Sequence, residues 1–206
     1  MLKLSLNRLY GLFGGDKMLD KSIEFFKIIL KREKGRELKC ETLPDGFRFV
    51  KFKKGDEKAW AEIEKSVLEF ENAKDGEEYF KNKYLPYIDE LERRTIFIEN
   101  NNGEKIATFT AWWRYTGERR HPFMEWVAVK PEYQGKGLGK ALISEGVKLM
   151  IAIEGDCDMY IPTQTWSYKA IRLYRWAGFE FETEEKFPGG IKNETLEGIK
   201  VIKNLI

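Results

Sequence analysis

The residues best suited to chemistry are three glycines that stand between an apolar strand and an apolar helix. The strand is expected over residues 123–129, and Lys130-Pro131 ends it because proline cannot donate to a ladder. The segment Gln134-Gly135-Lys136-Gly137-Leu138-Gly139 follows and opens a helix expected over 138–154. Glycines let the backbone approach a ligand closely, and the amide groups of a helix N-terminus favour an anion. This segment therefore predicts a phosphate or pyrophosphate site made mainly by the main chain.

The spacing of these glycines does not fit the two common nucleotide-binding motifs. A dinucleotide fingerprint requires G-x-G-x-x-G, but its last position falls on Lys140 or on Leu142, depending on where it begins. A Walker A loop requires a second glycine five residues after the first, and that position is again Lys140. A site for ATP or NAD at this loop is therefore disfavoured.

The sequence predicts that the loop is positioned by a meander of strands followed by alternating strands and helices. Short polar loops separate the expected strands, which predicts antiparallel neighbours, and the later alternation predicts an α+β fold with one dominant sheet. The expected strands are 47–52, 95–99, 106–115, 123–129, 159–162, 179–182 and 199–202, and the later helices are 138–154 and 167–177. Helices between Trp60 and Arg94, broken near Pro86, are expected to form a wall over a cleft.

The N-terminal part of the chain is expected to be an added helical region. Apolar residues between Asp16 and Arg32 recur at helical spacing, and Gly35 would end the helix. We therefore divide the chain into an N-terminal helical extension, 1–42, and a main domain, 43–206.

The composition excludes several classes of function. The 206 residues carry 36 basic and 34 acidic side chains, which gives no electrostatic case for nucleic acid. One histidine and two cysteines make a metal site improbable, and no apolar run is long enough to cross a bilayer. The expectation is a cytoplasmic protein without a metal or a membrane partner; a homodimer is compatible with the sequence.

Two motifs resemble those of the GNAT superfamily of N-acetyltransferases. Gln134, Gly137 and Gly139 fit motif A, [RQ]-x-x-G-x-[GA], and the stretch Ser167 to Phe179 resembles motif B. Within motif B, Ala170, Tyr174, Gly178 and Phe179 match in register, whereas Ser167 stands where asparagine is usual. The resemblance covers 125–179 and implies the GNAT fold, one mixed and mostly antiparallel twisted sheet flanked by helices, here with an extra N-terminal helix.

The resemblance also implies acetyl-CoA as cosubstrate, and it implies which residues contact it. A bulge should splay the strand at 127–129 from its neighbour and free backbone amides for the pantetheine arm and the thioester oxygen. The side chains of Lys136 and Lys140 either approach the phosphates or form a solvated rim. The expected cofactor-binding residues are Val127, Ala128, Val129, Gln134, Gly135, Lys136, Gly137, Leu138, Gly139, Lys140, Ser167 and Ala170.

The resemblance assigns Tyr174 as the acid that protonates the departing thiolate, the alternative being that it only packs near the sulfur. The general base is left open. Glu125 interrupts an apolar face of the central strand, so it is either the base or a salt-bridged structural residue. His121 is more typical of a loop histidine, and a water relay without a dedicated base is a further alternative.

The function that follows is transfer of an acetyl group from acetyl-CoA to a primary amine of a small molecule or peptide by direct attack. A non-catalytic acyl-CoA-binding regulatory module is the alternative. Tryptophans 112, 113, 126 and 166 either line the acceptor cleft or belong to the core.

Overall fold

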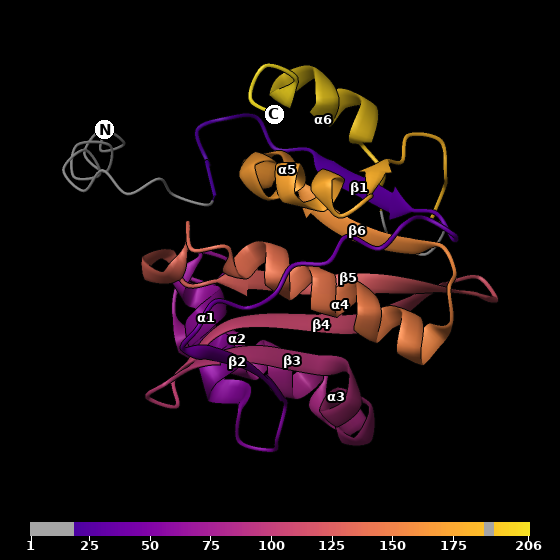
Figure 1. Cartoon of the computed structure of the whole chain (residues 1–206). Coiled ribbons are helices and arrows are strands. Elements are labelled where there is room, and N and C mark those ends of the chain that lie inside the picture. Colours follow the sequence, from indigo (N-terminus) through magenta and orange to yellow (C-terminus); the bar gives the residue numbers. More distant parts are fainter. Residues whose placement is uncertain (1–18, 188–191) are drawn as a thin grey trace.

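The computed structural model describes residues 19–187 and 192–206, which build one seven-stranded sheet in the order β2-β3-β4-β5-β6-β1-β7 (Figure 1). Among the described residues, all strand pairs are antiparallel except β5 with β6, which is parallel. This confirms the mixed, mostly antiparallel sheet. The strands are β1 (Lys27–Arg32), β2 (Phe47–Lys51), β3 (Thr95–Asn100), β4 (Lys105–Thr116), β5 (Arg119–Val129), β6 (Met159–Gln164) and β7 (Glu180–Phe181).

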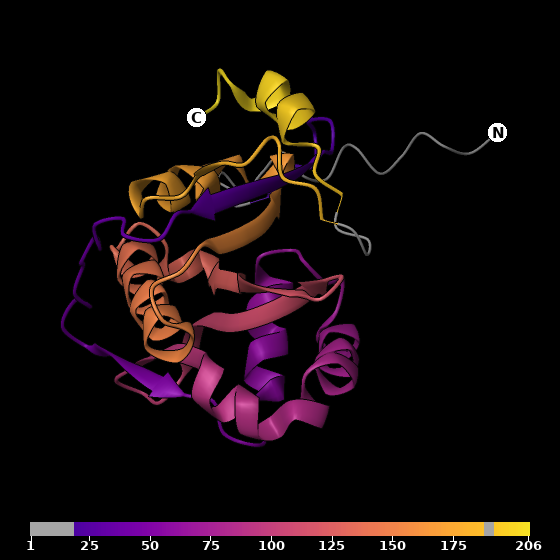
Figure 2. The ribbon, with the colours of Figure 1, turned by 90° about the vertical axis from the view of Figure 1, so that its right-hand side faces the viewer.

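Helices cover both faces of the sheet, because side chains alternate between the faces along each strand. In β3, Ile96 and Ile98 join the core that contains α4 residues, whereas Phe97 joins the core that contains α1 and α2 residues. Figure 2 shows α4 on one side of the sheet and α1 to α3 on the other. The helices are α1 (Glu57–Ser66), α2 (Ala73–Lys83), α3 (Ile88–Arg94), α4 (Leu138–Glu154), α5 (Tyr168–Trp176) and α6 (Thr195–Ile202), with short 3-10 turns η1 (Leu85–Tyr87), η2 (Pro131–Tyr133) and η3 (Thr165–Ser167).

The predicted N-terminal helix is wrong wherever the structure describes it. Residues 16–18 lie outside the described range, 19–26 form no helix, and 27–32 form β1 between β6 and β7. Ile28, Ile29 and Leu30 are consecutive and all buried, which suits a strand covered on both faces and not an amphipathic helix. A short apolar run fits a helix and a strand equally well, so the spacing alone did not identify this segment as a strand. Part of the region assigned to an extension therefore lies inside the same sheet as the main domain.

The last predicted strand is also wrong, because residues 199–202 belong to the helix α6. Gly198 allows this helix to lie close to β1, since a methyl group there would be 2.8 Å from the side chain of Ile28. The helix covers the face of β1 with its own apolar side, which includes the buried Ile202. The short segment Ile199-Lys200-Val201-Ile202 carried no information on this packing.

The predicted bulge lies in β5 at Trp126 and Val127. Thr108 pairs with Ala128 and Thr110 pairs with Glu125, so these two residues of β5 stand opposite the single residue Phe109. Trp126 has φ 55°, an uncommon value for a residue other than glycine. Within the described chain, β5 pairs with β6 only at Phe123 and Tyr160, so the two parallel strands separate before the bulge. This separation creates the cleft described below.

Candidate active site

The glycine loop presents unpaired main-chain amides at the start of α4. Gly135 and Gly137 have φ values of 76° and 83°, which only glycine adopts without strain. The Nε2 of Gln134 donates to the carbonyl of Val129 at 2.7 Å and so ties the loop to the end of β5. Within the described residues, the amides of 135–139 donate to no protein acceptor. The loop can therefore offer these amides and the helix N-terminus to an anion.

The other residues of the loop have separate roles. Leu138 is buried in the core, and a methyl group on Gly139 would lie 3.1 Å from Leu173 of α5, so this glycine permits close helix packing. Lys136 and Lys140 are exposed, with their ammonium groups over the rings of Tyr133 and Trp176 at 5.0 and 4.9 Å. These contacts hold both lysines on the rim of the loop.

A cleft of about 320 Å³ opens where β5 and β6 separate. It brings together predicted residues of β5, the strand before motif A, and of motif B, while residues 134–140 lie beyond the end of β5 and outside the cleft lining. The predicted residues that line it are Glu125, Val127, Ala128, Val129, Ser167, Ala170 and Tyr174. The strand that leads into motif A and the segment that carries motif B thus line one cavity.

Tyr174 lies on the α5 wall and is buried. Burial raises the pKa of its phenol well above the ordinary value, and the nearby carboxylates of Glu69 and Glu64 raise the pKa further. The hydroxyl therefore stays protonated at neutral pH and can donate a proton within the cleft.

Glu125 lines the cleft, and donors occupy both of its oxygens. The guanidinium of Arg114 donates from Nε to Oε1 at 2.6 Å, and its Nη2 lies 2.5 Å from the same oxygen. The hydroxyl of Tyr84 donates to Oε2 at 2.8 Å. Tyr84 also accepts from the indole of Trp126 at 2.5 Å. Glu125 therefore has the salt-bridged environment that the sequence left as one of two alternatives.

Two carboxylates of the cleft, Glu64 and Glu69, were missed by the sequence analysis. Glu64 projects from α1 and is 1% exposed, and burial followed by the charge of Glu69 raises its pKa well above the ordinary value. A signal was present: Trp60, Ile63 and Val67 form an apolar stripe at helical spacing, and Glu64 stands within that stripe. A carboxylate at a core-facing position needs a partner or a function.

Aromatic rings from α1, from α2 and from the segment between them pack around Trp126 of β5, which lines the cleft. Trp126 has its ring centroid 5.0 Å from that of Trp60, 5.3 Å from Tyr79 and 5.8 Å from Phe70. The bulge at this residue sets the backbone geometry from which its ring makes these contacts. Trp112 and Trp113 stack on each other at 4.4 Å and lie outside the cleft lining.

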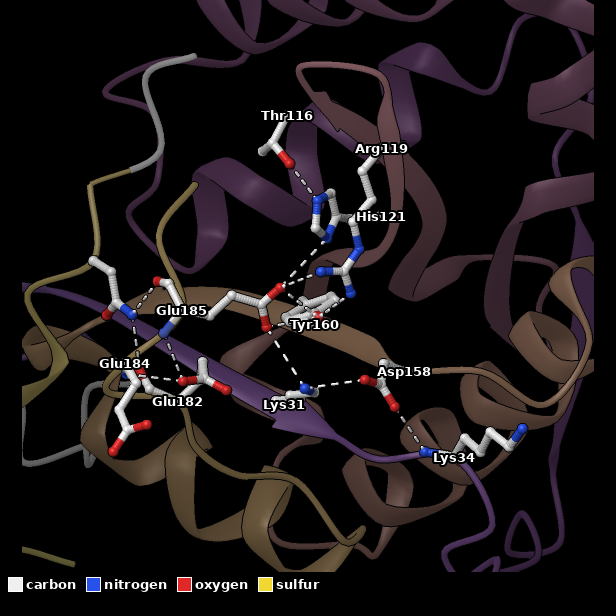
Figure 3. A network of polar contacts seen from close by, with 11 residues as sticks. Lys31, Lys34, Thr116, Arg119, His121, Asp158, Tyr160, Glu182, Glu184 and Glu185 are labelled. Carbon is white, nitrogen blue, oxygen red and sulfur yellow. Dashed lines mark hydrogen bonds and ion pairs between the residues drawn. The ribbon is translucent and has the colours of Figure 1, made fainter. Parts of the chain in front are cut away.

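His121 is buried in a polar network where β5 and β6 are still close, and it does not line the cleft (Figure 3). Its Nε2 bonds the hydroxyl of Thr116, and Nδ1 lies 4.0 Å from Glu185. Glu185 also accepts from Tyr160 at 2.8 Å. Burial, with the charge of Arg119, lowers the pKa of His121, so the imidazole is neutral. This network joins β5 and β6 and the segment after β7 and supports no base in the cleft.

The described residues hold neither a metal-binding cluster nor a membrane-spanning helix. No set of three or more histidine, cysteine, aspartate or glutamate side chains is arranged to hold a metal ion there. None of the helices in that part of the chain has the length and apolarity needed to cross a membrane.

Comparison with known proteins agrees with this geometry. A thialysine N-epsilon-acetyltransferase from Sus scrofa is 30% identical over 78 residues, which are 32% of this chain and 45% of that protein. A GCN5-related N-acetyltransferase from Sphaerobacter thermophilus superimposes with a TM-score of 0.58 at 17% identity, over 78% of this chain and 49% of that chain. A GNAT-family acetyltransferase from Colwellia psychrerythraea superimposes with a TM-score of 0.56 at 15% identity, over 77% of this chain and 54% of that chain. The chain thus spans about half the length of these relatives.

The structural likenesses, at such low identity, establish the fold. The family follows from a separate match: the model of the acetyltransferase (GNAT) family fits residues 58–179, which is more than half of the chain and includes both motifs, the glycine loop and most of the residues that line the cleft. The chain belongs to the acetyltransferase (GNAT) family.

Proposed function

We propose that this protein transfers the acetyl group of acetyl-CoA to a primary amine of a small molecule or peptide by direct attack. One observation carries the proposal: the cleft at the separation of β5 and β6 is lined by the bulged strand and by Tyr174, and it lies beside the glycine loop. A binding site for an elongated thioester needs these features in this order: an anion site, a strand with free amides, and a proton donor. The acetyltransferase family and the named relative support an acyl-transfer reaction.

The loop is suited to the pyrophosphate of acetyl-CoA, which supplies the activated acetyl thioester. The amides of 135–139 and the dipole of α4 would bind the phosphates, and Lys136 and Lys140 add positive charge at the rim. Along β5, residues 127–129 line the cleft, and amides that lack a β6 partner can bond the pantetheine arm and the thioester oxygen. Ser167 and Ala170 form the opposite wall.

Acyl transfer then needs a proton for the thiolate and a neutral amine. Tyr174 is our candidate for the acid, because its buried hydroxyl faces the cleft and its raised pKa keeps it protonated. Glu125 remains a candidate for the base through its place in the lining, although Arg114 and Tyr84 already bond its oxygens.

The relative's name makes thialysine a first acceptor to try, followed by a panel of amines and peptides. Acetyl-CoA is expected to raise the melting temperature, by an amount that grows with its concentration, while ATP and NAD leave it unchanged. Release of free thiol that depends on an added amine would demonstrate transfer. A thermal shift with no thiol release from any amine would favour a non-catalytic acyl-CoA-binding module. No shift at saturating acetyl-CoA would exclude the proposal.

A further inference from the structure

Glu64 differs from every other carboxylate that lines the cleft. Its side chain is 1% exposed, and its Oε1 is buried without a hydrogen-bond partner among the described residues. A buried carboxylate without partners is costly in a folded protein, and such groups concentrate at functional sites. The oxygen belongs to a residue of the cleft wall, so a molecule in the cleft can reach this side chain.

The end of α1 holds a second carboxylate beside the first. The amide of Glu69 donates to the carbonyl of Glu64 at 3.1 Å, and that of Leu68 to the carbonyl of Lys65 at 2.9 Å. This is the bonding pattern of a Schellman cap, in which Leu68 takes the left-handed position at φ 70° that glycine usually occupies. The cap returns the chain toward the cleft, which Glu69 also lines.

We propose that the Glu64 carboxylate, with Glu69 beside it, receives the ammonium group of the acceptor and takes its proton, so that the acceptor is an aliphatic primary amine that is cationic in solution. This inference rests on the proposed acetyl transfer and names its base and its substrate class. Glu64 would contact the reacting amine and is in that sense a catalytic residue.

The groups around Glu64 fit this assignment. Glu69 adds negative charge from the cap, and Tyr174 faces both carboxylates from α5. The positive charge of Lys21 partly offsets the rise that burial causes in the pKa of Glu69, and the side-chain amide of Gln164 donates to Glu69 at 3.3 Å. The guanidinium of Arg114, which also lines the cleft, is engaged by Glu125. Among the described residues, Glu64 therefore has no cation of its own, and an incoming ammonium would supply one.

The proton balance is complete with these residues. The ammonium gives one proton to Glu64, and the neutral amine attacks the thioester carbon. A C–N bond forms and the C–S bond breaks, and its electron pair leaves on sulfur, which takes a proton from Tyr174. The attacking nitrogen loses a second proton, which restores the tyrosine through solvent, and Glu64 releases its own proton to solvent. A raised pKa makes Glu64 a stronger base than an exposed glutamate.

The test compares Glu64→Gln with Glu62→Gln, a control on the same helix whose side chain is exposed and paired with Lys65. n-Butylamine and L-lysine are the probes, and thiol release is followed from neutral pH to about pH 10, near the pKa of an alkyl ammonium. Glu64→Gln is expected to lower kcat/KM at neutral pH by about 100-fold or more, and the loss should shrink as pH rises and the amine deprotonates by itself. Glu62→Gln should match wild type, and acetyl-CoA affinity should be unchanged in both.

The outcomes separate this inference from the proposed function. Wild-type protein that fails to bind acetyl-CoA contradicts both. Protein that binds acetyl-CoA but turns over neither probe at saturating amine contradicts an alkyl ammonium site and leaves the cofactor site in place. A Glu64→Gln variant with wild-type activity, or with a loss that is equal at every pH, excludes Glu64 as the proton acceptor.

Discussion

The two walls of the cleft are built on different principles. The β5 wall and the glycine loop beyond it expose main-chain groups from one continuous stretch, 125–139. The ionisable side chains of Glu64, Glu69 and Tyr174 come from α1, from the segment after α1 and from α5, and they meet only in the folded protein. Main-chain anion binding depends on where glycines allow the backbone to turn. Proton chemistry depends on which ionisable side chains the fold leaves buried and unpaired.

The same contrast appears between the two buried glutamates of the cleft. Glu125 has a guanidinium and a hydroxyl on its oxygens, whereas Glu64 has an oxygen with no partner among the described residues. Burial alone therefore does not identify a reactive carboxylate. The partners decide whether a buried carboxylate is held as part of the structure or remains available to a substrate.

The largest effect is expected from Gly137→Val, which tests the main-chain wall. Gly137 has φ 83°, and a β-branched residue is strained there and distorts the amides around it. Acetyl-CoA affinity, measured by calorimetry, should fall by about 100-fold or more. The control is Gly117→Val, which introduces similar strain at φ 63° in the turn between β4 and β5. Equal affinities of the two variants would contradict a role for the loop.

A smaller effect is expected from Tyr174→Phe on the side-chain wall. The variant keeps the packing of the ring but removes the proton donor, so kcat should fall by about 10- to 100-fold while acetyl-CoA affinity stays nearly constant. Tyr168→Phe on the same helix, outside the cleft lining, is the control. Unchanged turnover in the Tyr174 variant would remove the acid role and leave the packing alternative.

The smallest effects are expected in a comparison of the stabilities of Glu125→Gln and Glu64→Gln. Loss of the Glu125 charge leaves Arg114 without its ion pair, and we expect a loss of about 1–3 kcal/mol in the free energy of unfolding. Glu64→Gln should instead stabilise the protein at neutral pH, because it removes a carboxyl group whose ionisation is penalised by burial in the folded state. Each 1 kcal/mol corresponds to about 2–4 °C in melting temperature for a domain of this size.

The pH dependence of the free energy of unfolding shows whether ionisation of Glu64 stabilises or destabilises the folded protein. Because its pKa is raised in the folded state, folded protein binds more protons than unfolded protein, and the stability associated with Glu64 is lost as pH rises through that raised pKa. The advantage of Glu64→Gln should therefore be greatest at the higher pH and disappear below the ordinary pKa of glutamate. An advantage that does not vary with pH would contradict the raised pKa.

Sequence patterns predicted most strands and helices of the main domain, because alternating and helical spacings are local. They predicted the wrong element at 27–32 and at 199–202, where short apolar runs fit a strand or a helix equally well. The predicted cofactor-binding residues and the roles of Tyr174 and Glu125 remain predictions. The structure places Val127, Ser167 and Tyr174 around one cleft and Lys136 and Lys140 on an exposed rim.

The sequence by itself determined the glycine loop and its kind of chemistry, because the spacing of Gln134, Gly137 and Gly139 between a strand and a helix is a local property of the chain. It also determined that Glu64 interrupts an apolar stripe. Only the tertiary structure decided that β1 completes the sheet and that Arg114 pairs with Glu125. Only the fold also decided that Glu64 and Tyr174 line one cleft, with no cation paired to Glu64 among the described residues. Burial and pairing depend on residues far apart in the chain, and no local spacing encodes them.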